Sequence, residues 1–419
     1  MSERTSSTDE GTTRPATKRD LKSRRFFWFR IAALALGSFL GLVVLEFALR
    51  AHERLSRLGT MRSHDGYSIS DPELGIRPAP NTPGHDENGF RNLVVPTQAD
   101  VVCVGDSQTW GVNVLTPGTW PVRLASLTGV RVYAMAVGGY GPCQYEVLAR
   151  RALKLRPKTI VVAVYLGNDL YDAYRDVHVN ALREDLRGPS PLPELTNDTI
   201  AESSASEVRA CHEFLQSYSS GTIRGVPNWL RGHSAIGRRL DKSGLWPGAT
   251  RGFFTDAYVA YAQLHPESCS VWLVGPNPTC FLPKYRLCGL NLEDPRIAEG
   301  LRITRLELAA TQGLCAEAEV RLIVVLWPTK ESSYARLVSG QAIPATFTRL
   351  VSMEARVREN LLQNLQAEGI AFIDALGPFQ DAIGRGECLF PSDDEGHPAA
   401  PGYDLIARLV RDRLATIGD

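Results

Sequence analysis

The sequence predicts an α/β fold built on a parallel sheet. Short runs of apolar, mostly β-branched residues alternate with amphipathic helical patterns, and glycines or small polar residues follow the ends of several runs. Strands separated by helices in this way form βαβ units, whose strands lie parallel. The expected strands are 101–104, 130–137, 159–166, 320–326 and 370–373. The expected helices are 119–126, 144–155, 297–315, 345–367 and 402–414.

Composition narrows the functional classes. The chain has 419 residues, of which 44% are hydrophobic, so it can bury a large core. Lys and Arg together number 46, and Asp and Glu together also number 46. Because the net charge is zero, it gives no indication of nucleic-acid binding, and we exclude that class of partner. The eight cysteines form no Cys-x-x-Cys pair, and no ligand cluster indicates a metal or cofactor. Cys269, Cys280 and Cys288 are close enough in sequence for a local disulfide, whose pairing stays open.

The N-terminal region predicts a membrane anchor. Residues 1–25 are polar, end in a basic cluster and are expected to be a disordered tail. Residues 26–49 follow as a transmembrane helix, because 31–45 carries no charge and aromatic residues precede it. A signal peptide is the alternative, but no small-residue cleavage pattern follows. The basic cluster favours a cytoplasmic N-terminus and an extracytoplasmic remainder in the cell membrane, although arginines after the helix weaken this asymmetry.

The rest of the chain divides into a connector and one large domain. Residues 50–98 contain several glycines and prolines and are interpreted as the connector. The domain covers 99–419, with an insertion at about 175–290 where periodicity fades. We expect this insertion to cover or flank the functional site, and the sequence does not assign its elements.

Ser107 is the candidate nucleophile. It follows the first strand in the turn Gly105-Asp106-Ser107. In open α/β sheets ligands bind beyond the carboxyl ends of the strands, so a hydroxyl at this position is placed for chemistry. The alternative interpretation is a tight turn in which Ser107 caps the next helix.

His397 is the candidate general base for this serine. Asp394 lies three residues before it, and Gly396 lets the intervening chain turn so that the carboxylate reaches the imidazole. Asp393 competes for this orienting role, and Asp394 is preferred for its spacing. The alternative is that His397 is an exposed loop histidine without a catalytic role.

Two further residues are candidate oxyanion donors. Asn168, in Gly-Asn-Asp after the third strand, offers a side-chain amide, and Gly139, in Gly-Gly-Tyr-Gly after the second, offers a backbone N–H. The alternatives are a helix N-cap for Asn168 and an ordinary glycine turn for Gly139.

In chain order, the sequence carries the four blocks Gly-Asp-Ser, Gly-Gly-Tyr-Gly, Gly-Asn-Asp and Asp-x-x-His. These blocks in this order resemble those of the SGNH hydrolases, also called GDSL-type esterases and lipases, of a membrane-anchored bacterial type. The resemblance covers about residues 85–415 apart from the insertion. It implies a flavodoxin-like three-layer α/β/α sandwich with a parallel sheet, preceded by the single transmembrane helix. It also implies a catalytic triad of Ser107, Asp394 and His397, and an oxyanion hole of Ser107, Gly139 and Asn168.

Further residues bear on the subfamily. Asn88-Gly89-Phe90-Arg91 is similar to the segment that leads into the domain in some bacterial members. Ala134 and Ala136 stand near where many members carry an Asn before the glycines of the second block, and Ala399 stands where an Asn often follows the histidine. None of the three replaces a residue with a chemical role.

The expected function is a serine esterase without a cofactor. It would hydrolyse an acyl ester, including acetyl, of a carbohydrate or lipid through an acyl-enzyme, with an acylated small molecule or polysaccharide as substrate. One alternative is an O-acetyltransferase acting on a cell-envelope or exported polysaccharide. Pro328-Thr329-Lys330-Glu331 followed by Tyr334 is similar to a segment of membrane-linked proteins with that activity, unless Lys330 and Glu331 are a solvated loop pair. A further alternative is a non-catalytic, membrane-anchored glycan-binding protein.

Overall fold

The computed structural model describes residues 18–58, 68–82, 84–188, 195, 197–221, 234, 236, 250–273, 278–338 and 343–418. The chain divides into two compact units. The first comprises residues 1–54 with 225–243, and the second comprises 55–224 with 244–419.

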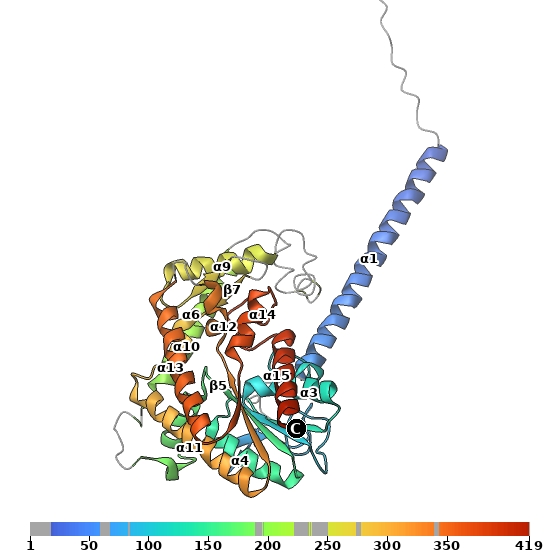
Figure 1. The fold of residues 1–419 in the computed structure, drawn as a ribbon. Helices are drawn as coiled ribbons and strands as arrows, with labels where there is room; N and C mark the ends of the chain where they lie inside the picture. Colours follow the sequence, from blue (N-terminus) through green and yellow to red (C-terminus); the bar gives the residue numbers. More distant parts are fainter. Residues whose placement is uncertain are drawn as a thin grey trace, which may run out of the picture. The chain divides into compact units, whose positions relative to one another are not determined.

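The first unit contains most of the long helix α1 (Lys18–Leu58). Its segment Trp28–Arg50 has 23 residues with a mean hydropathy of 2.2, none of them buried, so it is long and apolar enough to cross a membrane (Figure 1). Residues 1–17 of the expected disordered tail lie outside the described residues. Residues 18–25 already belong to α1, which therefore begins before the expected residue 26.

The second unit is built on a five-stranded parallel sheet. Its strand order is β4-β3-β5-β8-β9, which in chain order is the 2-1-3-4-5 arrangement of flavodoxin-like folds. This confirms the predicted fold class, and each expected strand is present. The bounds are β3 (Val101–Gly105), β4 (Val132–Ala136), β5 (Thr159–Tyr165), β8 (Arg321–Trp327) and β9 (Ala371–Asp374).

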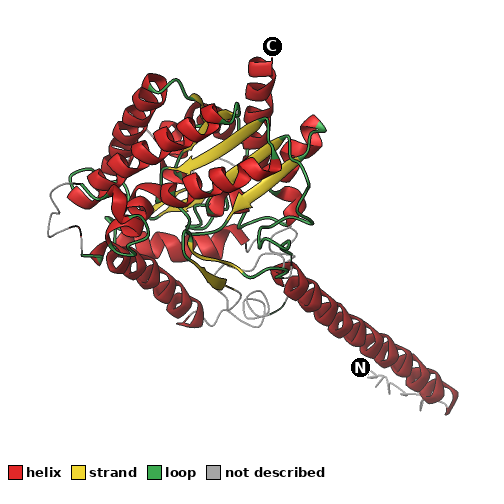
Figure 2. Ribbon diagram, turned by 90° about the horizontal axis from the view of Figure 1, so that it is seen from below, coloured by secondary structure: helices red, strands yellow, loops and turns green. Residues whose placement is uncertain are grey.

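Helices cover both faces of the sheet, as Figure 2 shows. In β5 the buried side chains alternate: Val162 faces one core and Val161 the other. The first core is closed by α4 (Pro142–Ala152), α5 (Asp169–His178), α11 (Pro295–Glu317) and α13 (Ala345–Ala367). The second is closed by α3 (Trp120–Thr128), α12 (Lys330–Val338), α14 (Leu376–Gly384) and α15 (Ala400–Gly418). With both faces covered, the C-terminal edge of the sheet is left for the polar loops that follow the strands.

Regular elements also occupy the connector and the insertion. The connector contains the antiparallel pair β1 (Ser68–Asp71) and β2 (Gly75–Pro78). The insertion contains α6 (Thr199–Gly221), α9 (Thr250–Leu264), the antiparallel pair β6 (Ser270–Trp272) and β7 (Thr279–Phe281), and α10 (Pro283–Leu287). These elements of the insertion share a small core of their own, which includes Cys211, Tyr258 and Tyr261.

The expected local disulfide is not formed. All eight cysteines are free thiols. The Sγ atoms of Cys269 and Cys280 lie 3.5 Å apart, well beyond the bonded distance of about 2.05 Å. The Cys288 thiol donates instead to the carbonyl of Lys284 at 3.3 Å.

The packing of α11 against α5 requires a glycine. A Cβ placed on Gly300 would lie 1.8 Å from the carbonyl oxygen of Leu170, a backbone atom that cannot move aside cheaply. We expect Gly300→Ala to lower the free energy of unfolding by about 1–3 kcal/mol, as overpacking does. Gly313→Ala on the same helix is the matched control, because a Cβ there meets no atom within 4 Å. The control should be neutral or stabilising by up to about 1 kcal/mol in urea titrations. Equal effects of the two substitutions would contradict the close approach.

Candidate active site

Ser107 lies at the point where the chain leaves β3. It is the first residue of the short helix α2 (Ser107–Trp110), whose cap is Asp106 rather than Ser107: the Asp106 carboxylate accepts from the N–H of Gln108 at 2.8 Å. The turn is tight, because a Cβ on Gly105 would lie 2.2 Å from Thr109 Oγ1. The local sequence therefore presents the Ser107 hydroxyl at the C-terminal edge of the sheet.

The hydroxyl of Ser107 contacts the imidazole of His397, as predicted for the pair. The distance from Ser107 Oγ to His397 Nε2 is 2.7 Å. His397 lies in the loop that leads into α15, and its carbonyl accepts from Asn113 Nδ2 at 2.8 Å. The Asp106 carboxylate is a second, longer acceptor for the hydroxyl at 3.3 Å. A hydroxyl carries one proton, so the shorter contact to His397 is favoured.

The carboxylate on the other side of the imidazole belongs to Glu395, and the preference for Asp394 is wrong in its geometry. Glu395 Oε1 lies 2.5 Å from His397 Nδ1 and also accepts the backbone N–H of His397 at 3.0 Å. Gly396 separates the two residues, and the longer glutamate side chain turns back to reach both groups. Glu395 was not among the expected site residues: the acidic run before His397 marks the segment, but its spacing does not distinguish Glu395 from the two aspartates.

The side chain of Asp394 is directed to the insertion. Its Oδ1 accepts from the Tyr258 hydroxyl at 2.6 Å, and its Oδ2 lies 3.0 Å from His212 Nε2. The competing residue, Asp393, accepts the backbone N–H of Glu395 at 3.2 Å. Asp394 and Asp393 therefore shape the loop, and of the three acids only Glu395 contacts the His397 ring.

The electrostatics of Glu395 fix the hydrogen-bond roles along this line. Burial alone would raise the pKa of its carboxyl, but the bonds from His397, aided by the nearby charge of Arg286, lower it to about 2. An ionised carboxylate only accepts, so the Nδ1 of a neutral imidazole must donate to it. Nε2 is then left as the acceptor of the Ser107 proton.

The two expected oxyanion donors follow the strands on either side of β3. Gly139 follows β4 with φ of +84°, a conformation that favours glycine. Asn168 follows β5 and precedes α5, where it makes no side-chain capping bond. Its Nδ2 donates to Asp172 Oδ2 at 2.5 Å, which leaves the second amide hydrogen for a ligand. The N–H of Ser107, as the first residue of α2, has no partner within the helix.

The ion pair between Arg175 and Asp172 connects the two expected oxyanion donors, Gly139 and Asn168. Arg175 Nη1 lies 2.9 Å from Asp172 Oδ1, and its Nη2 donates to the Gly139 carbonyl at 3.1 Å. Asp172 in turn accepts from Asn168. Burial raises the pKa of Asp172 to about 7, against the opposing charge of Arg175. Asn168 and Gly139 are thus held by one continuous network.

The segment that leads into the domain supports the helix α2, which begins with Ser107. Arg91 is only 4% exposed, and its guanidinium donates to the carbonyls of Trp110, Gly111 and Val114 at 2.7–2.9 Å. It also lies over the Trp110 ring. Arg91 therefore binds the carbonyl end of α2, whose other end presents Ser107.

Lys330 and Glu331 are not the solvated loop pair of the alternative interpretation. They are 1% and 4% exposed, at the start of α12 directly beyond β8. Lys330 Nζ donates to carbonyls of the loop that carries Glu395. Tyr334, in the next turn of α12, packs against Phe390 beside the same loop.

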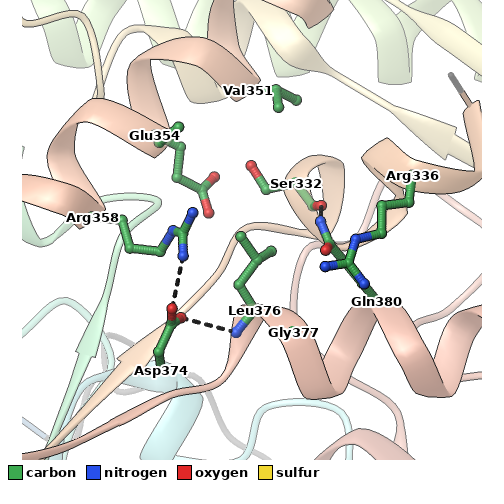
Figure 3. A pocket seen from close by; sticks show the side chains of 10 residues that line it. Ser332, Arg336, Val351, Glu354, Arg358, Asp374, Leu376, Gly377 and Gln380 are labelled. Atoms are coloured by element: carbon green, nitrogen blue, oxygen red, sulfur yellow. Dashed lines mark hydrogen bonds and ion pairs between the residues drawn. The ribbon is translucent and has the colours of Figure 1, made fainter. Parts of the chain in front are cut away.

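A cavity of about 420 Å³ lies nearby, at the end of β9. Figure 3 shows Arg358 bound to Asp374, with Glu354 and Ser332 on the adjoining wall. None of the expected catalytic residues lines this cavity. Its connection to the site is Glu354, which also holds the residue before Lys330.

The lowered pKa of Glu395 predicts a pH-dependent contribution to stability. Because its folded value of about 2 lies below the ordinary 4.5, the contribution is complete above about pH 4.5 and is lost as the pH falls through about 2. The difference in unfolding free energy between wild type and Glu395→Gln, followed by urea titration in detergent, should shrink over this range. A difference that stays constant down to pH 2 would contradict the assignment.

Comparison with known proteins gives distant structural likenesses. No protein-family model and no curated protein matches the chain. A GDSL-like lipase from Bacteroides thetaiotaomicron is 13% identical, covers 76% of this chain and 88% of its own, and has a TM-score of 0.31. A member of the lipolytic G-D-S-L family from Veillonella parvula is 12% identical over 76% and 96%, with a TM-score of 0.34. An extracellular lipase from Streptomyces rimosus is 13% identical over 76% and 99%, with a TM-score of 0.34. At such scores the functional assignment depends on the geometry of the site.

Proposed function

We propose that this protein is a serine esterase of the SGNH type, with Ser107 as nucleophile, His397 as general base and Glu395 as the orienting carboxylate. The observation that carries the proposal is the hydrogen-bonded line from Glu395 through His397 to Ser107, with contacts of 2.5 and 2.7 Å. A nucleophile, a base within hydrogen-bond reach and a third group that orients the base are the requirements of acyl transfer through serine. Ser107 comes from the start of α2, and His397 and Glu395 come from the loop that leads into α15.

The first half of the reaction follows from these contacts. Ser107 Oγ attacks the ester carbonyl while its proton passes to His397 Nε2. The Glu395 carboxylate stabilises the imidazolium that forms. The developing oxyanion is bound by the N–H groups of Ser107 and Gly139 and by the amide of Asn168, and one such donor lowers the barrier by about 3–4 kcal/mol.

Acylation ends when His397 gives its proton to the departing alcohol, which leaves an acyl group on Ser107. In the second half, water is the nucleophile: it attacks the acyl-enzyme with His397 again as base, and the acid is released. If a sugar hydroxyl takes the place of water, the same residues perform acyl transfer.

The proposed substrate is an acyl ester, including acetyl, of a carbohydrate or lipid. Two features support an envelope-associated substrate: the Trp28–Arg50 segment suits a membrane anchor, and the site lies in a domain tethered by it. We place this domain on the extracytoplasmic side, in keeping with the basic cluster that precedes the Trp28–Arg50 segment.

Labelling with a fluorophosphonate tests the nucleophile. The full-length protein in detergent should be labelled and should hydrolyse members of a panel of acetyl and longer acyl esters, whereas Ser107→Ala should lose both properties. Supplying an acetyl donor with and without a polysaccharide acceptor then shows whether water or sugar receives the acetyl group. Undiminished labelling of Ser107→Ala removes this residue from its role. An unlabelled, inactive wild type that still binds glycan would favour the non-catalytic alternative.

A pair of substitutions tests which acid orients the base. Glu395→Gln keeps the shape of the side chain but removes the negative charge that faces His397 Nδ1, so kcat should fall by about 10²–10⁴-fold. Asp394→Asn, one residue away, should change kcat by less than about 10-fold, because Asp394 contacts Tyr258 and His212 instead of the ring. Steady-state kinetics on the best ester of the panel measure both. The reverse order would restore Asp394 as the orienting acid.

A further inference from the structure

The loop that carries Glu395 and His397 is wrapped around one buried ammonium group. Lys330 Nζ donates to the carbonyl of Pro391 at 2.8 Å and to that of Asp393 at 2.5 Å, and lies 3.5 Å from that of Glu395. The Lys330 side chain is fully enclosed. An ammonium has three donors, and here three carbonyls of alternate residues surround it.

This arrangement explains how a buried charge is tolerated. Removing an ammonium from water is costly unless hydrogen bonds replace the lost hydration. Within the described part of the chain no carboxylate oxygen lies within ion-pair distance of Nζ, so carbonyl dipoles provide these bonds. Burial lowers the pKa of Lys330, while the nearby charge of Asp393 opposes that shift.

The curvature that Lys330 imposes is the one that the proposed catalytic line needs. While the carbonyls of 391, 393 and 395 face the ammonium, the Asp394 side chain accepts from Tyr258 of the insertion. Glu395 is fixed at its own carbonyl, and its side chain returns to both the N–H and the ring of His397. A loop with another curvature would carry Glu395 away from Nδ1.

The backbone from which the Lys330 side chain extends is itself held in place. Lys330 follows the central-sheet strand β8, and the preceding residue, Thr329, is bound to the Glu354 carboxylate of α13 through its backbone N–H at 3.1 Å and also through its hydroxyl. Both Thr329 and Glu354 are buried. The ammonium is therefore a fixed point to which the loop is bound.

We propose that Lys330 is a positioning residue of the esterase site, which sets the shape of the loop 391–397 so that Glu395 and His397 align with Ser107. This inference depends on the proposed function, because alignment matters only if these residues catalyse. Lys330 does not contact the reacting atoms, so its effect should appear in the chemical step rather than in substrate binding.

Substitution of Lys330 tests the proposal. Lys330→Met removes charge and donors and should lower kcat by about 10²-fold, the scale of a 1 Å misplacement, with KM within about twofold of wild type. The rate of fluorophosphonate labelling of Ser107 should fall in parallel. The matched control is Lys158→Met, because the Lys158 side chain is 75% exposed just before β5, at the opposite end of the sheet. This control should retain wild-type kinetics.

Two further variants keep the test decisive if Lys330→Met does not fold. Other bonds hold the loop, including Cys280 N–H to the Ser392 carbonyl at 3.2 Å, so we expect the milder variants to fold. Lys330→Arg keeps charge and donors, and Lys330→Gln keeps donors alone, so kcat should decrease in the order wild type, Arg, Gln. Wild-type kcat in the Gln variant, or a loss confined to a raised KM, would overturn the inference. If wild type itself is not labelled, the proposed function fails instead.

Discussion

The contact between Ser107 and His397 joins residues that lie 290 positions apart in the chain. Such a contact depends on the parallel sheet, because parallel strands deliver all their C-terminal loops to one edge. Both faces of this sheet are buried, so the strands are apolar along most of their length and polar residues gather at their ends and in the loops. The hydrophobic core thus determines where chemistry can occur, and the loops determine which chemistry it is.

Three cations hold these loops, and each does so through backbone carbonyls. Arg91 binds the carbonyl end of α2, Arg175 binds the carbonyl of Gly139, and Lys330 binds the loop before His397. Carbonyl oxygens do not titrate in the physiological range, whereas carboxylates do. The carbonyl contacts of Arg91 and Lys330 therefore do not depend on the charge of an acid. Arg175 differs, because it is also paired with the carboxylate of Asp172, whose pKa burial raises to about 7.

How far the sequence predicted this site depends on the kind of information each residue carries. Ser107, Gly139 and Asn168 follow strands, so the strand pattern placed them at one edge of a parallel sheet. The flavodoxin-like arrangement of that sheet came from the resemblance to the SGNH hydrolases. His397 was placed by its block and by its position before the last helix. Glu395 was missed because residue spacing does not reveal which of three consecutive acids turns inward.

Residues distant in sequence determine which of the three acids contacts His397. Lys330 attracts the carbonyls of alternate loop residues, and Tyr258 and His212 of the insertion bind Asp394 on the outer side. The insertion was the part of the chain whose elements periodicity did not assign, so its contacts could not be foreseen. The sequence also left the burial of Lys330 open, because a lysine that follows a strand is more often exposed to solvent.

Two carboxylates flank the Ser107–His397 pair, and their environments shift them in opposite directions. Burial raises the pKa of Asp106 to about 6, although the Gln108 N–H and the charge of His397 oppose this, whereas contact with His397 lowers that of Glu395 to about 2. With this pKa the Glu395 carboxyl is ionised at neutral pH. Asp106 caps α2 and adds negative charge beneath the serine. In the proposed reaction both favour the imidazolium over the neutral ring, but only Glu395 also fixes the direction of Nδ1, which is why orientation of the base is assigned to it alone.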